Sequence, residues 1–138
     1  MGDDDLPQKR KKFCYIGAPA IFRLELAMQH ISRAWSGAYD HVGCYVVGSA
    51  LERPDWRDID VVMIMDDAAF AREFPDAKTH WEHDPKWLLL TVSISAWLTD
   101  QCGHAVDFKF QSMTHANEKH AGPRNAVGLR FAPEMEAT

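Results

Sequence analysis

The chain has 138 residues, of which 46% are hydrophobic and 25% charged, as in an ordinary globular domain rather than a disordered or fibrous protein. The formal net charge is -5, so the molecule as a whole repels a polyanion, and we expect no nucleic-acid binding through bulk electrostatics. The longest uncharged run, Trp87 to Thr99, is shorter than the roughly 20 apolar residues that cross a bilayer, so we expect no membrane protein. Three cysteines cannot all pair with one another, which favours reduced thiols and a cytoplasmic location.

The hydrophobic patterns predict one domain with a short segment at each end. Residues 1–12 combine three aspartates with a basic run, and we expect a mobile N-terminal segment. Residues 13–115 contain the regular patterns and are predicted to form the core domain. Residues 116–138 are polar and contain glycine and proline, which predicts a wrapping loop or tail.

The first half of the predicted core contains one long helix and two strands. Apolar residues recur at helical spacing from Pro19 to Trp35, and Gly37 is expected to stop this helix. The apolar run from Val42 to Val47 is rich in residues that favour strands, and it predicts a short buried strand. A second apolar run, from Ile59 to Met65, predicts a second buried strand.

Two further helices are predicted after the second strand. Ala68 to Phe74 fits a short helix. Asp84 followed by Pro85 is typical of a helix start, and helical phase continues to Gly103. The β-branched residues in 91–94 are also compatible with a strand, although the helix is the preferred interpretation.

A third strand is predicted from Ala105 to Gln111, because apolar and polar residues alternate there. One face would carry Val106, Phe108 and Phe110, and the other Asp107, Lys109 and Gln111. The order of elements predicts an α/β or α+β fold, in which a small mixed β-sheet of three or more strands packs with helices.

Three aspartates are candidate catalytic and metal-binding residues. Asp58 and Asp60 stand two apart at the start of the second strand, so they project from one face about 7 Å apart. Asp107 lies between apolar residues on the third strand, where a charge needs a partner or a metal ion. Taken singly, each is more often an ordinary surface charge or an ion-pair partner, as Asp107 would be with Lys109 or Arg130.

The turn Gly48-Ser49 lies between the first strand and the aspartate pair. Glycine lets the backbone approach a ligand closely, and the adjacent serine offers an amide and a hydroxyl at a possible helix N-terminus, where anions are favoured. This combination is typical of phosphate binding.

These motifs resemble the DNA polymerase beta-like nucleotidyltransferase superfamily, and by size the minimal nucleotidyltransferases within it. The match reads Val47-Gly48-Ser49, then eight residues, then Asp58-Ile59-Asp60-Val61, and later Val106-Asp107-Phe108. The spacer is a little shorter than is usual in the family, and Ala50-Leu51-Glu52-Arg53 lacks the small residues that often follow the turn.

The resemblance implies an enzyme that moves a nucleoside monophosphate from a nucleoside triphosphate to a hydroxyl group and releases pyrophosphate. Asp58, Asp60 and Asp107 would be catalytic and would bind Mg²⁺, with Mn²⁺ as an alternative. Gly48 and Ser49 would hold the β- and γ-phosphates. Because the triphosphate needs further positive charge, Lys109 and Arg124 are candidate phosphate-binding residues. The acceptor would be a protein, a small molecule or an RNA end, and a partner protein is one candidate for presenting it.

Two other functions fit parts of the sequence. A catalytically inactive module of the same fold would keep the cleft and bind a nucleotide or a partner. A zinc-stabilised domain would use His80, His83, Cys102 and His104, but their spacing matches no standard zinc motif. The tryptophans at 81, 87 and 97 are interpreted as core residues rather than as a base-stacking surface.

Overall fold

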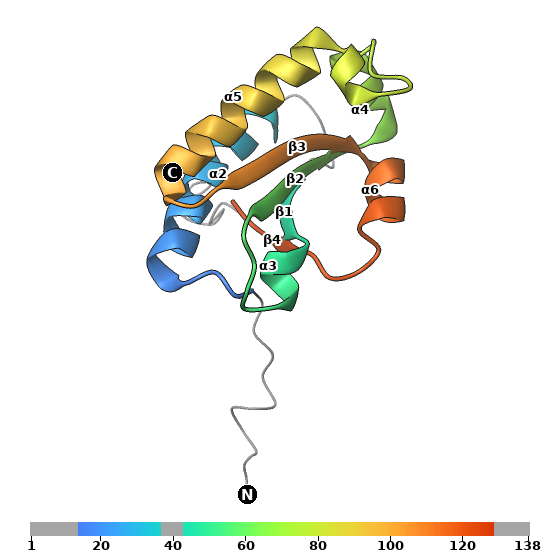
Figure 1. Ribbon diagram of the computed structural model, residues 1–138. Helices are drawn as coiled ribbons and strands as arrows, with labels where there is room; N and C mark the ends of the chain where they lie inside the picture. Colours follow the sequence, from blue (N-terminus) through green and yellow to red (C-terminus); the bar gives the residue numbers. More distant parts are fainter. Residues whose placement is uncertain (1–13, 37–42, 129–138) are drawn as a thin grey trace, which may run out of the picture.

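The computed structural model describes residues 14–36 and 43–128 (Figure 1). The predictions for residues 1–12, for Gly37 and Val42, and for the last ten residues of the chain lie outside these ranges. The described elements are α2 (Ala18–Ser36), β1 (Gly43–Val47), α3 (Ser49–Glu52), β2 (Ile59–Met65), α4 (Asp67–Glu73), the 3₁₀ helix η1 (Trp81–His83), α5 (Pro85–Cys102), β3 (Val106–Ser112), α6 (Met113–Lys119) and β4 (Asn125–Ala126).

The strands form one mixed sheet in the order β3-β2-β1-β4. β1 is antiparallel to both β2 and β4, whereas β2 and β3 are parallel. A parallel pair needs a long crossover connection, and here the chain makes it through α4, η1 and α5. The predicted fold class, a small mixed sheet packed with helices, is confirmed.

Helices cover the two faces of the sheet unequally. In Figure 1, α5 runs alongside β3, and α2 lies next to α5 on the same side of the sheet. The main core lies between these helices and the sheet, and its largest fully buried side chains include Leu24, Met28, Met63, Phe108 and Phe110. The opposite face carries a smaller apolar cluster, in which Ala116 of α6 packs with Val47, Val62 and Ile64. This second face is the one on which the site described below lies.

Several predicted elements agree closely with the structure. α2 and β2 lie where the hydrophobic patterns put them. The ambiguous residues 91–94 are helical, and α5 ends at Gly103, which adopts the left-handed conformation with a φ of 86°. Among the described helices, none is long and apolar enough to span a bilayer.

The region expected to be a loop or tail contains two regular elements. α6 begins after Ser112, whose hydroxyl accepts a hydrogen bond from the amide of His115. β4 then pairs with β1, and Gly128 packs directly against the backbone of Met28 in α2. Residues 113–128 therefore complete the sheet and cover part of its second face, while the predicted domain boundaries remain predictions.

All three cysteines lie in the described ranges and are unpaired, as the odd count suggested. Cys44 and Cys102 are buried. Burial raises the pKa of the Cys44 thiol to about 11, and the hydrogen bond with Ser32 only partly opposes this effect. Cys44 is therefore a core residue with little thiolate at neutral pH.

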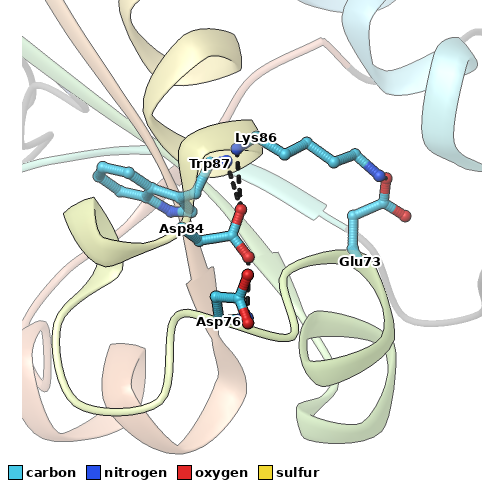
Figure 2. Close-up of polar contacts among 5 residues, drawn as sticks. All are labelled: Glu73, Asp76, Asp84, Lys86 and Trp87. Carbon is cyan, nitrogen blue, oxygen red and sulfur yellow. Dashed lines mark hydrogen bonds and ion pairs between the residues drawn. The ribbon is translucent and has the colours of Figure 1, made fainter.

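The connection between α4 and α5 is organised by the buried carboxylate of Asp84, which is only 2% exposed (Figure 2). Its Oδ1 accepts hydrogen bonds from the amides of Lys86 and Trp87, and its Oδ2 accepts one from the amide of Asp76. Lys86 also forms an ion pair with Glu73 of α4 at 2.6 Å. One side chain thus caps α5 and fixes the preceding loop, as the Asp-Pro signal partly predicted.

We expect Asp84→Ala to lower the free energy of unfolding by about 1–3 kcal/mol, because it leaves three amides without their acceptor. Denaturant unfolding measures this difference. Asp100→Ala, an exposed change on the same helix, is the matched control and should have little effect. An equal loss in both variants would contradict the role of Asp84.

The stabilisation by Asp84 should also depend on pH. Burial raises the pKa of Asp84, but the hydrogen bonds from the three amides and the charge of Lys86 outweigh burial, so the net shift is downward. A lowered pKa in the folded state stabilises the fold above the unfolded value of about 3.9, and this contribution disappears as the pH falls through the folded value. The stability difference between wild type and Asp84→Asn should therefore be constant from about pH 7 to about pH 5 and shrink below about pH 4. A difference that grew toward acid would contradict it.

Candidate functional site

The strand pairings bring two of the three candidate aspartates together. Asp60 of β2 is the register partner of Asp107 on the parallel strand β3. On its other side, Asp60 is the partner of Val47, the last residue of β1. Asp58 precedes β2 by one residue and is exposed. The aspartates and the Gly48-Ser49 turn, which the sequence separates by up to 60 residues, therefore lie at one edge of the sheet.

Gly48 is in direct contact with the Asp60 carboxylate. Its backbone has a φ of 80° and a ψ of -152°, a conformation that is essentially restricted to glycine. A Cβ atom at this position would lie 2.6 Å from Oδ2 of Asp60. The sequence predicted that a bound phosphate approaches this glycine, which remains a prediction; the group next to Gly48 in the structure is the Asp60 carboxylate. Ser49 then begins the four-residue helix α3, as the turn motif suggested.

The environment disfavours a negative charge on Asp60. Partial burial raises the pKa of Asp60, and the nearby charges of Asp107 and Asp58 raise it further, while Lys109 opposes them. Because like charges close together repel one another, a positively charged ligand at this edge would be stabilised.

Lys109 provides positive charge within this cluster. Its Nζ lies 2.8 Å from Oδ2 of Asp107, whose side chain is 47% exposed. The two residues lie on the same face of β3, so the ion pair considered from the sequence is present. At this exposure the pair contributes little to stability. Its importance is that the ammonium group lies against one of the candidate metal ligands.

The three aspartates suit a metal ion in their chemistry but not in their present positions. Carboxylate oxygens are suitable ligands for Mg²⁺, so Asp58, Asp60 and Asp107 fit the ion in their chemistry. As the side chains stand, no three Asp, Glu, His or Cys residues in the described ranges are close enough together to hold a metal ion. Metal binding would therefore require the carboxylates to turn toward one another and Lys109 to move away from Asp107.

The zinc ligand set considered from the sequence does not form a site in the described part of the chain. The rings of His80 and His83 contact each other, at 5.1 Å between centroids. The His104 ring instead packs against Trp56, at 5.2 Å. Among the residues the structure describes, no three His, Cys, Asp or Glu side chains lie close enough together to hold a metal ion.

A groove of about 210 Å³ extends from the carboxylates along the open face of the sheet. Its floor and walls are formed by Val47, Asp60, Val62, Trp81, Asp107, Lys109, Gln111, Lys119 and His120. The sequence identified the aspartates and Lys109 but gave no role to Gln111, Lys119 or His120. The alternation of β3 could have pointed to Gln111, whereas Lys119 at the end of α6 and His120 just after it reach the groove only through the tertiary fold.

The tryptophans differ from one another in their surroundings. Trp87 is buried, and its indole N–H donates to the carbonyl of Phe110, as expected of a core residue. Trp81 is partly buried: it packs on the core and also lines the groove. Trp97 is 40% exposed, so the core interpretation is wrong for this residue.

Arg124 lies at the C-terminal end of α6. Its guanidinium donates to the carbonyls of Ala116 and His120 and to the side chain of Asn117, and it lies over the Tyr45 ring. Arg124 is not one of the described residues that line the groove. In this arrangement it holds α6 against the sheet, and its predicted contact with phosphate remains a prediction.

Comparisons of this chain with protein-family models, with curated proteins and with solved structures found no match. The resemblance to nucleotidyltransferases therefore rests on the motif residues themselves. The geometry of the site adds independent information, because the register of three strands decides which motif residues meet.

Gly48→Ala tests the contact between the turn and Asp60. We expect it to lower the free energy of unfolding by about 3 kcal/mol or more, because the backbone is strained for alanine and the new Cβ meets the carboxylate. Gly103→Ala is the matched control, since Gly103 has a similar φ of 86° but nothing within 4 Å of the added atom. This control should lose only about 1–2 kcal/mol in the same denaturant unfolding experiment. Equal losses would show that Asp60 does not press on the turn.

Proposed function

We propose that this protein is a nucleotidyltransferase that moves a nucleoside monophosphate from a nucleoside triphosphate to a hydroxyl group. The observation that carries the proposal is the pairing of Asp60 with Asp107 on adjacent parallel strands, with Gly48 packed against Asp60. This arrangement supports the proposal because the residues that meet are those that the motif pairs, and their mutual repulsion favours a cationic ligand.

In this proposal Asp58, Asp60 and Asp107 hold Mg²⁺, or Mn²⁺ in its place. The metal, when bound, neutralises charge on the phosphates and on the attacking and leaving oxygens. The backbone amides at Gly48 and Ser49 are proposed to bind the β- and γ-phosphates. Lys109 would exchange its present partner, Asp107, for a phosphate oxygen, which is also a charge-assisted contact.

The reaction forms a bond between the acceptor oxygen and the α-phosphorus and breaks the bond from that phosphorus to the oxygen of the departing pyrophosphate. A carboxylate oxygen of Asp107 is proposed to take the proton of the acceptor hydroxyl, since Asp107 is the more exposed member of the pair. The acceptor would be a protein, a small molecule or an RNA end. The reduced cysteines support a cytoplasmic setting for this activity.

An inactive nucleotide- or partner-binding module of the same fold is the second candidate. The observation that favours it is the ion pair between Lys109 and Asp107, which places an ammonium group against a residue the enzyme would need as a metal ligand. Such a module would bind its ligand in the groove and transfer nothing.

Thermal unfolding with ATP, GTP, CTP and UTP, each with Mg²⁺ or with EDTA, tests nucleotide binding. A nucleotide at a hundred times its dissociation constant should stabilise the fold by about 2.7 kcal/mol, which raises the unfolding temperature by several degrees. We expect this shift to require Mg²⁺ and to disappear in Asp60→Asn, which removes one of the paired charges. Asp100→Asn, an exposed change on α5, should behave as wild type.

Release of pyrophosphate from the bound nucleotide distinguishes the two candidates. An enzyme should release pyrophosphate when a suitable acceptor is supplied, and Asp107→Asn should reduce the rate at least about a hundredfold, a typical loss for a general base. Binding without release for any acceptor would favour the inactive module. A lack of binding by all four nucleotides would contradict the enzyme and the nucleotide-binding module, and would leave only the partner-binding form of the second candidate.

A further inference from the structure

The groove continues well beyond the paired carboxylates. Asp107, Lys109 and Gln111 lie on the same face of β3, and each lines the groove. At about 3.3 Å per residue, Gln111 lies about 13 Å along the strand from Asp107. The apolar floor is formed by Val47 and Val62. A ligand with its phosphates at Asp107 therefore has room to extend toward Gln111.

Gln111 has an unsatisfied polar atom at this far end of the groove. Gln111 is only 2% exposed, and no group donates a hydrogen bond to its Oε1. Buried amide oxygens almost always have a partner, because an unmet acceptor destabilises the fold. The last torsion of a glutamine side chain is soft, so the amide can turn toward a donor in the groove that Gln111 lines. The missing partner is a hydrogen-bond donor.

The wall beside Gln111 is aromatic. Trp81 lines the groove and is held in place by His115, whose ring meets it edge-on at 4.6 Å, and by Trp87 at 5.4 Å. His120 also lines the groove, and its Nε2 likewise lacks a hydrogen-bond partner. Burial lowers the pKa of His120, and the charges of Arg124 and Lys119 lower it further, so the surroundings favour the neutral ring. A neutral ring and an indole favour a planar, uncharged group.

We propose that Gln111, Trp81 and His120 form a nucleobase site, in which the Gln111 carbonyl accepts a hydrogen bond from an exocyclic amino group of the base. The inference rests on the proposed function, since the carboxylate edge would hold the phosphates of the same nucleotide. The groove measures about 210 Å³, below the roughly 300–1,000 Å³ of sites that enclose a whole small molecule, so a nucleotide that extends along it from Asp107 to Gln111 would lie partly outside it. A base with an amino group would pack against the aromatic residues and would also donate a hydrogen bond to the unpaired Gln111 oxygen.

Matched pairs of nucleotides test this site directly. ATP differs from purine riboside triphosphate, and GTP from ITP, by one amino group, while CTP and UTP exchange an amino group for an oxygen. Dissociation constants with Mg²⁺ are measured by calorimetry on the full chain. We expect wild type to prefer the amino-bearing member of at least one pair by about tenfold or more, which corresponds to about 1.4 kcal/mol.

Two substitutions assign the preference to Gln111. Gln111→Met keeps the side-chain volume without the carbonyl, and Gln111→Asn withdraws the amide by one methylene; both should reduce the preference to about twofold or less. Gln101→Met, an exposed change on α5, is the control and should retain it.

The outcomes separate this inference from the proposed function. Tight binding with equal affinity within every pair would overturn the nucleobase site and leave the nucleotidyltransferase proposal standing. A preference that survives in both Gln111 variants would assign recognition elsewhere and also overturn the site. If no nucleotide bound to the wild type, the proposed function would fail, and this inference with it.

Discussion

The arrangement of β2 between an antiparallel and a parallel neighbour determines the rest of this structure. β2 is almost entirely apolar, and the one charged residue within it, Asp60, is placed at its N-terminal end. Antiparallel pairing with β1 brings the end of β1, and hence Gly48, to that same point. Parallel pairing with β3 brings the beginning of β3, and hence Asp107, to it from the other side. A shift of one residue in the pairing with β3 would place Asp107 on the face of the sheet opposite Asp60, and the same shift in the pairing with β1 would separate Gly48 from the Asp60 carboxylate.

Bringing these residues together is electrostatically unfavourable. Asp60 is partly buried beside a second carboxylate, and both effects raise its pKa. A fold optimised only for stability would place an apolar residue there, since a carboxylate in such surroundings is destabilising unless it is paired. Lys109 compensates part of the repulsion through Asp107. The backbone conformation of Gly48, which only glycine readily adopts, and the repulsion at Asp60 occur at the same edge of the sheet, and perturbed groups of this kind are often found at functional sites.

The sequence was sufficient to predict the elements with strong periodicity and the polar residues that cap a helix or alternate along a strand. β2 is bounded as its apolar run predicts, and Asp84 caps α5 as its position before Pro85 suggests. The segment expected to be a loop after Ser112 forms the helix α6. The sequence does not show this helix, because α6 is too short to have a clear periodicity and is stabilised by packing of Ala116 on the sheet and by the hydrogen bond from Arg124 to the Ala116 carbonyl. The predicted contact of Arg124 with phosphate remains a prediction, and the acceptors that its guanidinium meets in the structure are the carbonyls of Ala116 and His120 and the side chain of Asn117. The pairing of Asp60 with Asp107 needed the strand order, which composition and spacing do not contain.

Unequal coverage of the sheet explains why the groove exists at all. α2 and α5 bury one face completely enough that Phe108 and Phe110 of β3 are inaccessible, whereas the short helix α6 covers only part of the other. The alternation of β3 then places Asp107, Lys109 and Gln111 on the less covered face, in order of increasing distance from the carboxylate edge. Charge is concentrated at one end of this row and an uncharged amide beside aromatic rings at the other. Under the proposed function, this gradient suits a nucleotide that is planar and uncharged at one end and whose anionic end arrives with a bound cation, because the carboxylates alone would repel that end.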